Sequence, residues 1–112
     1  MTPTEIVQAQ LDAYNAQAID AFMACFAEDA VLADLNGAVT EAGAPAIRAR
    51  YAALFGAHPN NHARLVKRIA VGAVVIDHED IARGPDGPSF RAAAIYTVQA
   101  GRIVRVDFVR EG

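Results

Sequence analysis

Cysteine is almost missing from this sequence of 112 residues. Cys25 is the only one, so no disulfide bond can form within the chain. The apolar string FMACFA surrounds it, which favours a buried structural thiol over a reactive nucleophile. The sequence also has no Gly-rich phosphate loop, no GxSxG motif and no pair of cysteines. We therefore expect no cofactor.

Long hydrophobic runs are missing as well. The longest, IAVGAVVI at residues 69–76, is far shorter than the roughly 20 apolar residues that a membrane-spanning helix needs. The N-terminal MTPTEIVQ lacks the basic region and the apolar segment of a secretory signal. We therefore expect a cytoplasmic protein with no membrane contact.

The sequence has no excess of positive charge and few histidines. Ten Lys and Arg against thirteen Asp and Glu give a net charge of −3, whereas nucleic-acid-binding domains are typically basic. A metal site needs three or four convergent ligands, which we do not expect from His58, His62 and His78. No nucleic acid and no metal are therefore expected as partners.

Helical signals dominate the first half of the chain. The string TPTE at residues 2–5 is a capping box with proline at the first helical position, so it predicts a helix start. Apolar residues at helical spacing predict a second, short helix over residues 19–26. A third helix is predicted to begin at Pro45 and to stop at Gly56, shortly before His58-Pro59.

Strand signals dominate the second half. Residues 30–35 read as a first strand, followed by an Asn36-Gly37 turn and a short return strand over 38–40. Four longer strands are predicted at 62–71, 74–82, 89–99 and 102–110. Helices followed by long antiparallel strands are typical of an α+β protein. No linker or repeat divides the chain, so residues 1–112 are expected to form one domain.

Three strings carry a resemblance to a known group of proteins: LDAYNAQAIDAFMACFAEDAVLADLNG, APAIRARYAALF and GRIVRVDFVRE. In this order they resemble the nuclear-transport-factor-2-like superfamily, specifically its bacterial SnoaL-like and ketosteroid-isomerase-like branch. The resemblance covers nearly the whole chain. It implies a cone-shaped, cystatin-like fold in which three N-terminal helices pack on a strongly curved, mostly antiparallel sheet. It also implies a pocket between sheet and helices, and a homodimer formed through the outer face of the sheet.

The resemblance gives a role to Asp34. In the isomerase pattern of helix, Phe-Ala-x-Asp-Ala, strand, acid, x-x-Gly, Asp34 falls on the general base. The tyrosine and the protonated acid that stabilise the enolate oxygen of these isomerases fall on Gln10 and Ala94. One such donor contributes about 3 kcal/mol to transition-state stabilisation, so their loss speaks against steroid isomerase activity. Another isomerase, a cyclase or a hydrolase reaction remains open.

Asp34 also attracts attention on its own chemistry. A carboxyl group that is part-buried on an apolar strand loses hydration, which raises its pKa and suits it to proton transfer near neutral pH. The alternative is that Asp34 only caps the Asn36-Gly37 turn, as Asp residues often do.

A second charged string, VIDHED at residues 75–80, interrupts an apolar strand. Alternation gives two possible inward faces, one with His78 and one with Asp77 and Glu79. On the first face His78 becomes a catalytic acid or base; on the second, Asp77 or Glu79 does. A third possibility places the charges on the outer face, in cross-strand or dimer contacts.

Five residues are predicted to bind a substrate. Tyr14 and Tyr51 lie on helix faces that line the pocket in this superfamily, and Tyr96 alternates with small alanines that leave room beside its hydroxyl. Phe108 and Arg110 share one face of the last strand, with Arg110 near the mouth, where it can meet an anionic group.

Two functions remain at this point. The first is a pocket that holds a small, mostly apolar molecule, with Asp34 as general base and His78 or tyrosines as its helpers. The second is a non-enzymatic module that binds a ligand, or that binds another protein through the outer face of the sheet. The two differ in whether ionisable side chains converge in a cavity of several hundred Å³.

Overall fold

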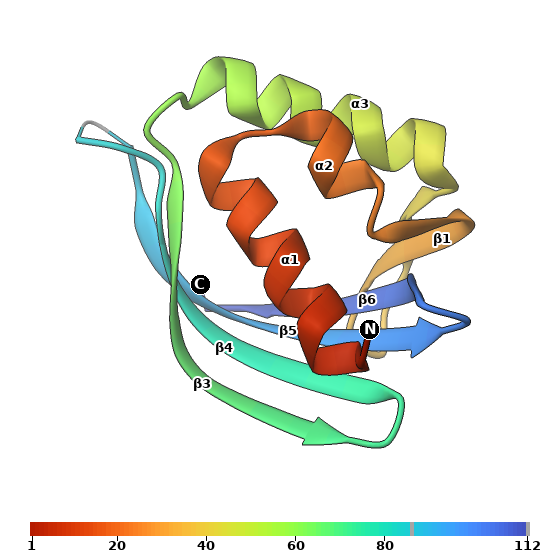
Figure 1. Cartoon of the computed structure of the whole chain (residues 1–112). Coiled ribbons are helices and arrows are strands. Elements are labelled where there is room, and N and C mark those ends of the chain that lie inside the picture. Colours follow the sequence, from red (N-terminus) through yellow and green to blue (C-terminus); the bar gives the residue numbers. More distant parts are fainter. Residues whose placement is uncertain (86, 112) are drawn as a thin grey trace.

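The computed structural model describes residues 1–85 and 87–111 (Figure 1). Within them the elements follow in the order α1 (Pro3–Ala16), α2 (Ile19–Met23), β1 (Phe26–Asp34), β2 (Val39–Ala42), α3 (Ala44–Ala57), β3 (His62–Val71), β4 (Val74–Ala82), β5 (Ser89–Gln99) and β6 (Arg102–Arg110). The strand order in the sheet is β2-β1-β6-β5-β4-β3. Among these described strands, β1 and β6 are parallel and the other neighbours antiparallel.

The sheet curves strongly and carries all three helices on its concave side (Figure 1). α1 lies inside the curve of the sheet, and α2 and α3 lie above α1 in the view of Figure 1. This confirms the predicted α+β cone with a mostly antiparallel sheet. No helix among the described residues has both the length and the apolar character to cross a membrane.

The capping box forms at the start of α1. The Glu5 backbone N–H donates to Thr2 Oγ1, and the Thr2 backbone N–H donates to Glu5 Oε1 at 2.8 Å. The same helix buries Val7, Leu11 and Tyr14 against the core, as its spacing indicated. The N-terminal signal therefore describes the local structure correctly.

The sequence placed some boundaries wrongly. Phe26 was assigned to the second helix but begins β1, because it pairs with Ile103 of β6 and is buried in the core. The backbone pairing with β6 outweighs a helical spacing of only a few residues. α3 runs through Gly56 to Ala57, since one glycine costs a helix only about 1 kcal/mol.

The last four strands have the predicted bounds. The predicted GPDGP connection between β4 and β5 includes Asp86, which lies outside the described residues.

An aromatic cluster holds the helices together above the sheet. The rings of Phe22 and Tyr51 lie 4.6 Å apart between centroids, and Tyr14 meets Phe55 edge-on at 5.7 Å. These contacts join α1, α2 and α3 and fix the helical roof over the concave face. Geometries of this kind add to the stability gained from burial alone.

Candidate active site

A cavity of about 370 Å³ lies between the concave face of the sheet and the helices. Its volume falls in the usual range for small-molecule pockets. Apolar and aromatic side chains form much of the wall, which is typical of ligand sites. The residues with polar groups that line it are Gln10, Tyr14, Arg50, Tyr51, His58, Glu79, Arg83, Tyr96 and Arg110.

The inward face of β4 carries Asp77 and Glu79. Both are buried, together with Val75, whereas the residues between them are only partly covered. Glu79 lines the cavity. His78 points to the opposite face, where it is the cross-strand partner of Lys67. The catalytic role predicted for His78 is therefore wrong for this pocket.

Glu79 is a buried acid at the cavity wall. Only 6% of the residue is exposed. Burial and, to a smaller extent, the negative charge of Asp77 together raise the pKa of its carboxyl to about 7, against a smaller opposing effect of Arg68. A carboxyl group with a pKa near the working pH can both accept and donate a proton. Glu79 thus has the property that we had expected of Asp34.

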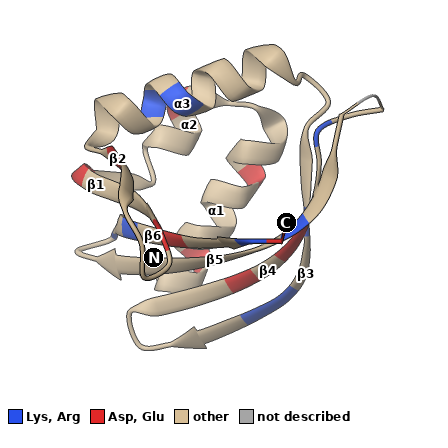
Figure 2. Cartoon of the chain, turned by 180° about the vertical axis from the view of Figure 1, so that it is seen from behind, with Lys and Arg blue, Asp and Glu red and all other residues tan. Residues whose placement is uncertain are grey.

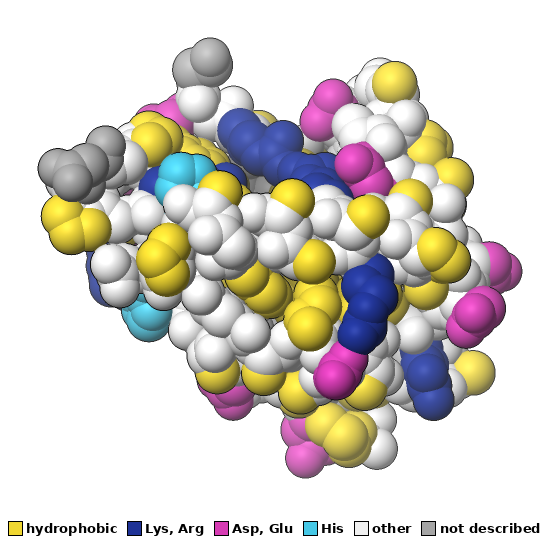
Figure 3. Space-filling view, turned by 90° about the horizontal axis from the view of Figure 1, so that it is seen from above, with side chains coloured by type: hydrophobic (Ala, Val, Ile, Leu, Met, Phe, Trp, Pro, Cys, Tyr) yellow, Lys and Arg dark blue, Asp and Glu magenta, His cyan; other side chains and the backbone are white. Residues whose placement is uncertain are grey.

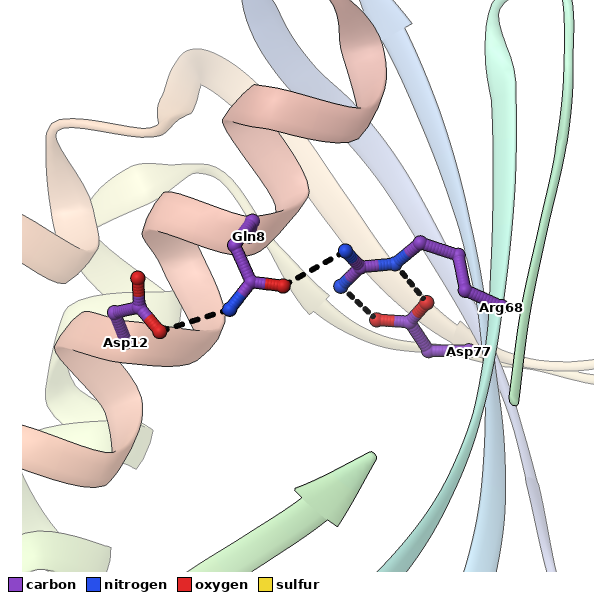
Figure 4. Close-up of polar contacts among 4 residues, drawn as sticks. All are labelled: Gln8, Asp12, Arg68 and Asp77. Carbon is purple, nitrogen blue, oxygen red and sulfur yellow. Dashed lines mark hydrogen bonds and ion pairs between the residues drawn. The ribbon is translucent and has the colours of Figure 1, made fainter. Parts of the chain in front are cut away.

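Asp77 is held by a chain of polar contacts (Figure 4). Its two carboxylate oxygens accept from Arg68 Nε at 2.7 Å and Nη2 at 2.9 Å. Arg68 Nη1 donates to Gln8 Oε1 at 2.8 Å, and Gln8 Nε2 donates to Asp12 Oδ1 at 2.8 Å. This series of hydrogen bonds joins β3 and β4 to α1, so Asp77 has a structural role in the sheet.

Charged residues of β4 lie beside those of β3, as Figure 2 shows. Besides Arg68 and Asp77, the pair Arg64 and Asp80 joins the two strands, and Arg91 of β5 approaches Asp80 at 3.8 Å. The possibility that charged residues of the VIDHED string lie on the outer face and make cross-strand contacts is thus correct for Asp80.

Asp34 lies outside the cavity. The side chain is exposed at the end of β1, and the residue is not among those that line the pocket. Its backbone N–H donates to the Ala38 carbonyl at 3.0 Å, and its carbonyl accepts from the Gly37 N–H at 2.9 Å. The predicted part-burial of Asp34 is therefore wrong, because the strand ends in a turn beyond the reach of the helical roof.

All five residues predicted to bind a substrate line the cavity: Tyr14, Tyr51, Tyr96, Phe108 and Arg110. Burial raises the pKa of Tyr51 to about 12 and that of Tyr96 well above its ordinary value. Both hydroxyls therefore remain protonated at neutral pH and can donate hydrogen bonds. That these five residues contact a ligand remains a prediction.

The sequence did not single out Arg50 or Arg83, and it treated Gln10 only as a lost donor. Gln10 is 6% exposed, and its Oε1 has no hydrogen-bond partner within residues 1–85 and 87–111. Arg83 continues the alternation of Glu79 and Ile81, so strand periodicity carried a signal for it. Arg50 had no such signal, because the alanines on several sides of its helix leave no clear division into polar and apolar faces.

Residues 7–106 match the model of the SnoaL-like domain. The chain belongs to the SnoaL-like family. An uncharacterised cystatin-fold protein from Novosphingobium aromaticivorans is 34% identical to it, with a TM-score of 0.92 and coverage of 98% of this chain and 99% of that one. None of the curated proteins is similar enough to be counted as a relative.

Two other solved structures resemble this SnoaL-like protein. One is proposed to be a polyketide cyclase from Sinorhizobium meliloti, 26% identical, with 94% of each chain covered and a TM-score of 0.77. The other is a Catenulispora acidiphila protein with a ketosteroid-isomerase-like fold, in complex with trimethylamine. It is 22% identical, covers 97% of this chain and 86% of its own, and has a TM-score of 0.78, so it shows the fold alone.

The site of this SnoaL-like protein combines Glu79, an acid with a pKa of about 7, with tyrosine hydroxyl donors in a mostly apolar cavity. Within the described part of the chain, no group of three or more His, Cys, Asp and Glu side chains is placed to hold a metal ion. The groups that line the cavity are suited to moving a proton and to orienting a ligand.

Proposed function

We propose that this SnoaL-like protein binds a small, mostly apolar molecule in the cavity and catalyses a cofactor-independent proton transfer, with Glu79 as general base and acid. The observation that carries the proposal is a buried carboxyl group at the cavity wall with a pKa of about 7. Glu79 takes the place of Asp34, whose exposed position cannot serve this cavity.

The proposed reaction begins with a carbon acid. Glu79 removes a proton from a carbon next to a carbonyl, and the electron pair of the C–H bond forms an enolate. In an isomerisation the protonated Glu79 returns the proton to another carbon. In a cyclisation the enolate carbon attacks a second carbonyl, and Glu79 protonates the alkoxide that forms. The relative from Sinorhizobium meliloti, proposed to be a polyketide cyclase, makes the second course a reasonable one to test.

Hydroxyl groups replace the oxyanion donors that are absent at Gln10 and Ala94. Tyr51 and Tyr96 line the same cavity as Glu79, and the charge of Glu79 contributes to the raised pKa of each tyrosine. A preorganised donor in a dry site stabilises a developing enolate oxygen far better than water does. Gln10 Oε1 can accept a hydrogen bond from a hydroxyl of the ligand.

The test compares Glu79→Gln with Asp34→Asn. The wild-type protein is screened for exchange of α-protons against deuterium in a set of enolisable ketones and β-keto esters, followed by NMR. A general base contributes roughly a hundredfold or more, so Glu79→Gln is expected to lose about that factor. Asp34→Asn is the matched control and is expected to keep full activity. Exchange that survives Glu79→Gln, or that is lost in Asp34→Asn, contradicts the proposal.

A second proposal concerns the outer face of the sheet, where we propose that a second copy of the chain docks. Ile69 is 59% and Val71 is 72% exposed. They pair across β3 and β4 with Ile76 and Val74, on the face opposite to Glu79. Light scattering on the eluting protein tests this: a mass of two chains supports it, and a mass of one chain overturns it.

A further inference from the structure

The cavity concentrates positive charge in a protein that is acidic overall. The chain carries a net charge of −3, yet three arginines line the cavity, and Glu79 is the only acidic residue among the described residues that line it. The arginines are Arg50, Arg83 and Arg110. Figure 3 looks down on α3 and shows basic side chains gathered along one edge of that helix, at a notch in the surface.

Arg83 is the most firmly held of the three. Its Nη1 donates to Asn61 Oδ1 at 2.7 Å and to the Tyr14 hydroxyl at 3.1 Å. Its guanidinium lies 5.0 Å from the centre of the Phe90 ring. Asn61 is only 3% exposed and Tyr14 is also buried, so rigid parts of the fold position the arginine. All of these partners are electrically neutral, and within residues 1–85 and 87–111 no carboxylate forms an ion pair with Arg83.

The remaining donors of Arg83 have the arrangement that binds a carboxylate. Both side-chain hydrogen bonds use Nη1, and within residues 1–85 and 87–111 neither Nε nor Nη2 donates to a protein group. Arg68 shows what this side of a guanidinium does in the same protein, because its Nε and Nη2 bind the two oxygens of Asp77. Such paired hydrogen bonds are strong and select planar oxyanions.

The other two arginines flank a different part of the wall. The guanidinium groups of Arg50 and Arg110 lie 5.8 and 4.9 Å from the centre of the same Phe108 ring. Arg50 also approaches Glu41 at 3.9 Å, so its charge is partly compensated. These two arginines add to the positive field of the cavity, which attracts an anion.

We propose that the natural ligand of the cavity is a small organic carboxylate whose anionic group is bound by Nε and Nη2 of Arg83, with Asn61 and Tyr14 as positioning residues. This inference rests on the proposed function in so far as the cavity is taken to be the ligand site. To the proposed function it adds that the substrate is negatively charged and that Arg83 is the residue that recognises this charge.

The positions of Arg83 and Glu79 also restrict the shape of the ligand. They are four residues apart on an extended segment, so their Cα atoms are separated by about 13 Å. A molecule that reaches both residues is therefore expected to be elongated, with its carboxylate several bonds away from the carbon that loses a proton. Elongated aryl or alkyl carboxylates fit this requirement, and a compact acid such as malonate does not.

The test uses two probes of nearly the same shape, one charged and one neutral, in which a carboxylate oxygen is replaced by an NH₂ group. Binding of 4-phenylbutanoate and of its neutral amide, 4-phenylbutanamide, is measured by titration calorimetry and by NMR shifts of the cavity residues. Hydrogen bonds to a charged group correspond to about ten- to a hundredfold in affinity, so the carboxylate is expected to bind tighter by about that factor. Phenyl phosphate is the third probe, and its binding in preference to the carboxylate overturns the choice of carboxylate.

Variants locate the effect. Arg83→Gln is expected to remove most of the preference for the carboxylate, with a remainder from Arg50 and Arg110, while the amide binds as before. Arg83→Lys keeps the charge without the paired donors and is expected to retain only part of the preference. Arg102→Gln is the control, because Arg102 is exposed and does not line the cavity. Thermal unfolding of each variant shows that it is folded.

The outcomes separate this inference from the proposed function. Equal binding of acid and amide, or a preference that Arg83→Gln leaves undiminished, overturns the carboxylate inference and leaves the role of Glu79 intact. A preference that depends on Arg83, together with full proton exchange in Glu79→Gln, supports the inference and overturns the proposed catalysis. If none of the probes binds, the inference is overturned, and proton exchange by Glu79 is then judged from the ketone screen alone.

Discussion

Asp77 and Glu79 lie two residues apart on β4 and point to the same side of the sheet, yet only Asp77 has an arginine bound to it. The Arg68 guanidinium pairs with both oxygens of Asp77, whereas Glu79 faces the cavity. Asp77 therefore joins the strands to the helix. Glu79 is shielded from water and lies close to the negative charge of Asp77, so its pKa is near 7. The difference in partners gives the two acids different uses.

The raised pKa of Glu79 predicts a pH-dependent stability. The pKa is about 7 in the folded chain against an ordinary 4.5, so between these values the folded state binds more protons than the unfolded state. The free energy of unfolding therefore falls as the pH rises from about 4.5 to 7, by about 3 kcal/mol from this group.

The variant Glu79→Gln lacks this penalty. We expect it to be more stable than the wild type above about pH 8 and close to it near pH 5. Urea unfolding across this range measures the difference. Other groups around Glu79 are Asp77, Arg68, Tyr51 and Tyr96, all of which are unchanged in the variant. A constant difference between the two proteins across the range contradicts the prediction.

The replacement Asp77→Asn is expected to destabilise the fold strongly. It leaves the part-buried Arg68 without its partner, and breaking a buried pair in this way costs about 3 to 5 kcal/mol. The same change removes a negative charge beside Glu79 and is expected to lower its pKa.

Asp80→Asn is the matched control on the same strand. Asp80 pairs with Arg64 at the surface, where an ion pair contributes about 0 to 1 kcal/mol. Chemical denaturation gives both free energies, and NMR titration gives the pKa of Glu79. Equal losses for the two variants count against a structural role for the buried pair.

Thr2→Ala is expected to lower the stability by about 1 kcal/mol. It removes the side-chain oxygen that accepts from the Glu5 N–H at the start of α1. Thr4→Ala, within the first turn of the same helix, serves as the control and is expected to change little. Hydrogen exchange in the first turn of α1 reports whether the loss is local, and unchanged protection there in Thr2→Ala argues against the cap.

Ile69→Lys is expected to convert the proposed dimer to single chains, because it places a charge in the centre of the apolar outer face. Leu35→Lys is the control at an apolar position of similar exposure next to β1. Light scattering measures the mass of each. Dissociation by Leu35→Lys alone places the contact elsewhere and contradicts the proposal.

The sequence determined much of the fold because its signals are local. A capping box, strand alternation and glycine turns act over a few residues, so they placed the start of α1 and the bounds of β3 to β6 correctly. Strand alternation pointed to Tyr96, Phe108 and Arg110, and the resemblance to the superfamily pointed to Tyr14 and Tyr51; all five line the cavity. The local signals failed at Phe26, where pairing with β6 replaced the helix that the spacing indicated.

The tertiary structure alone decided which acid faces the cavity. Alternation shows that Asp77 and Glu79 share a face, but the face turned inward depends on the helices packed against it and on an arginine from β3 that pairs with Asp77. Asp34 had the better motif and is nevertheless exposed, because the roof of helices does not cover the end of β1. Burial changes the pKa of a carboxyl group, and burial depends on how the elements pack. It can therefore be predicted only indirectly from the sequence.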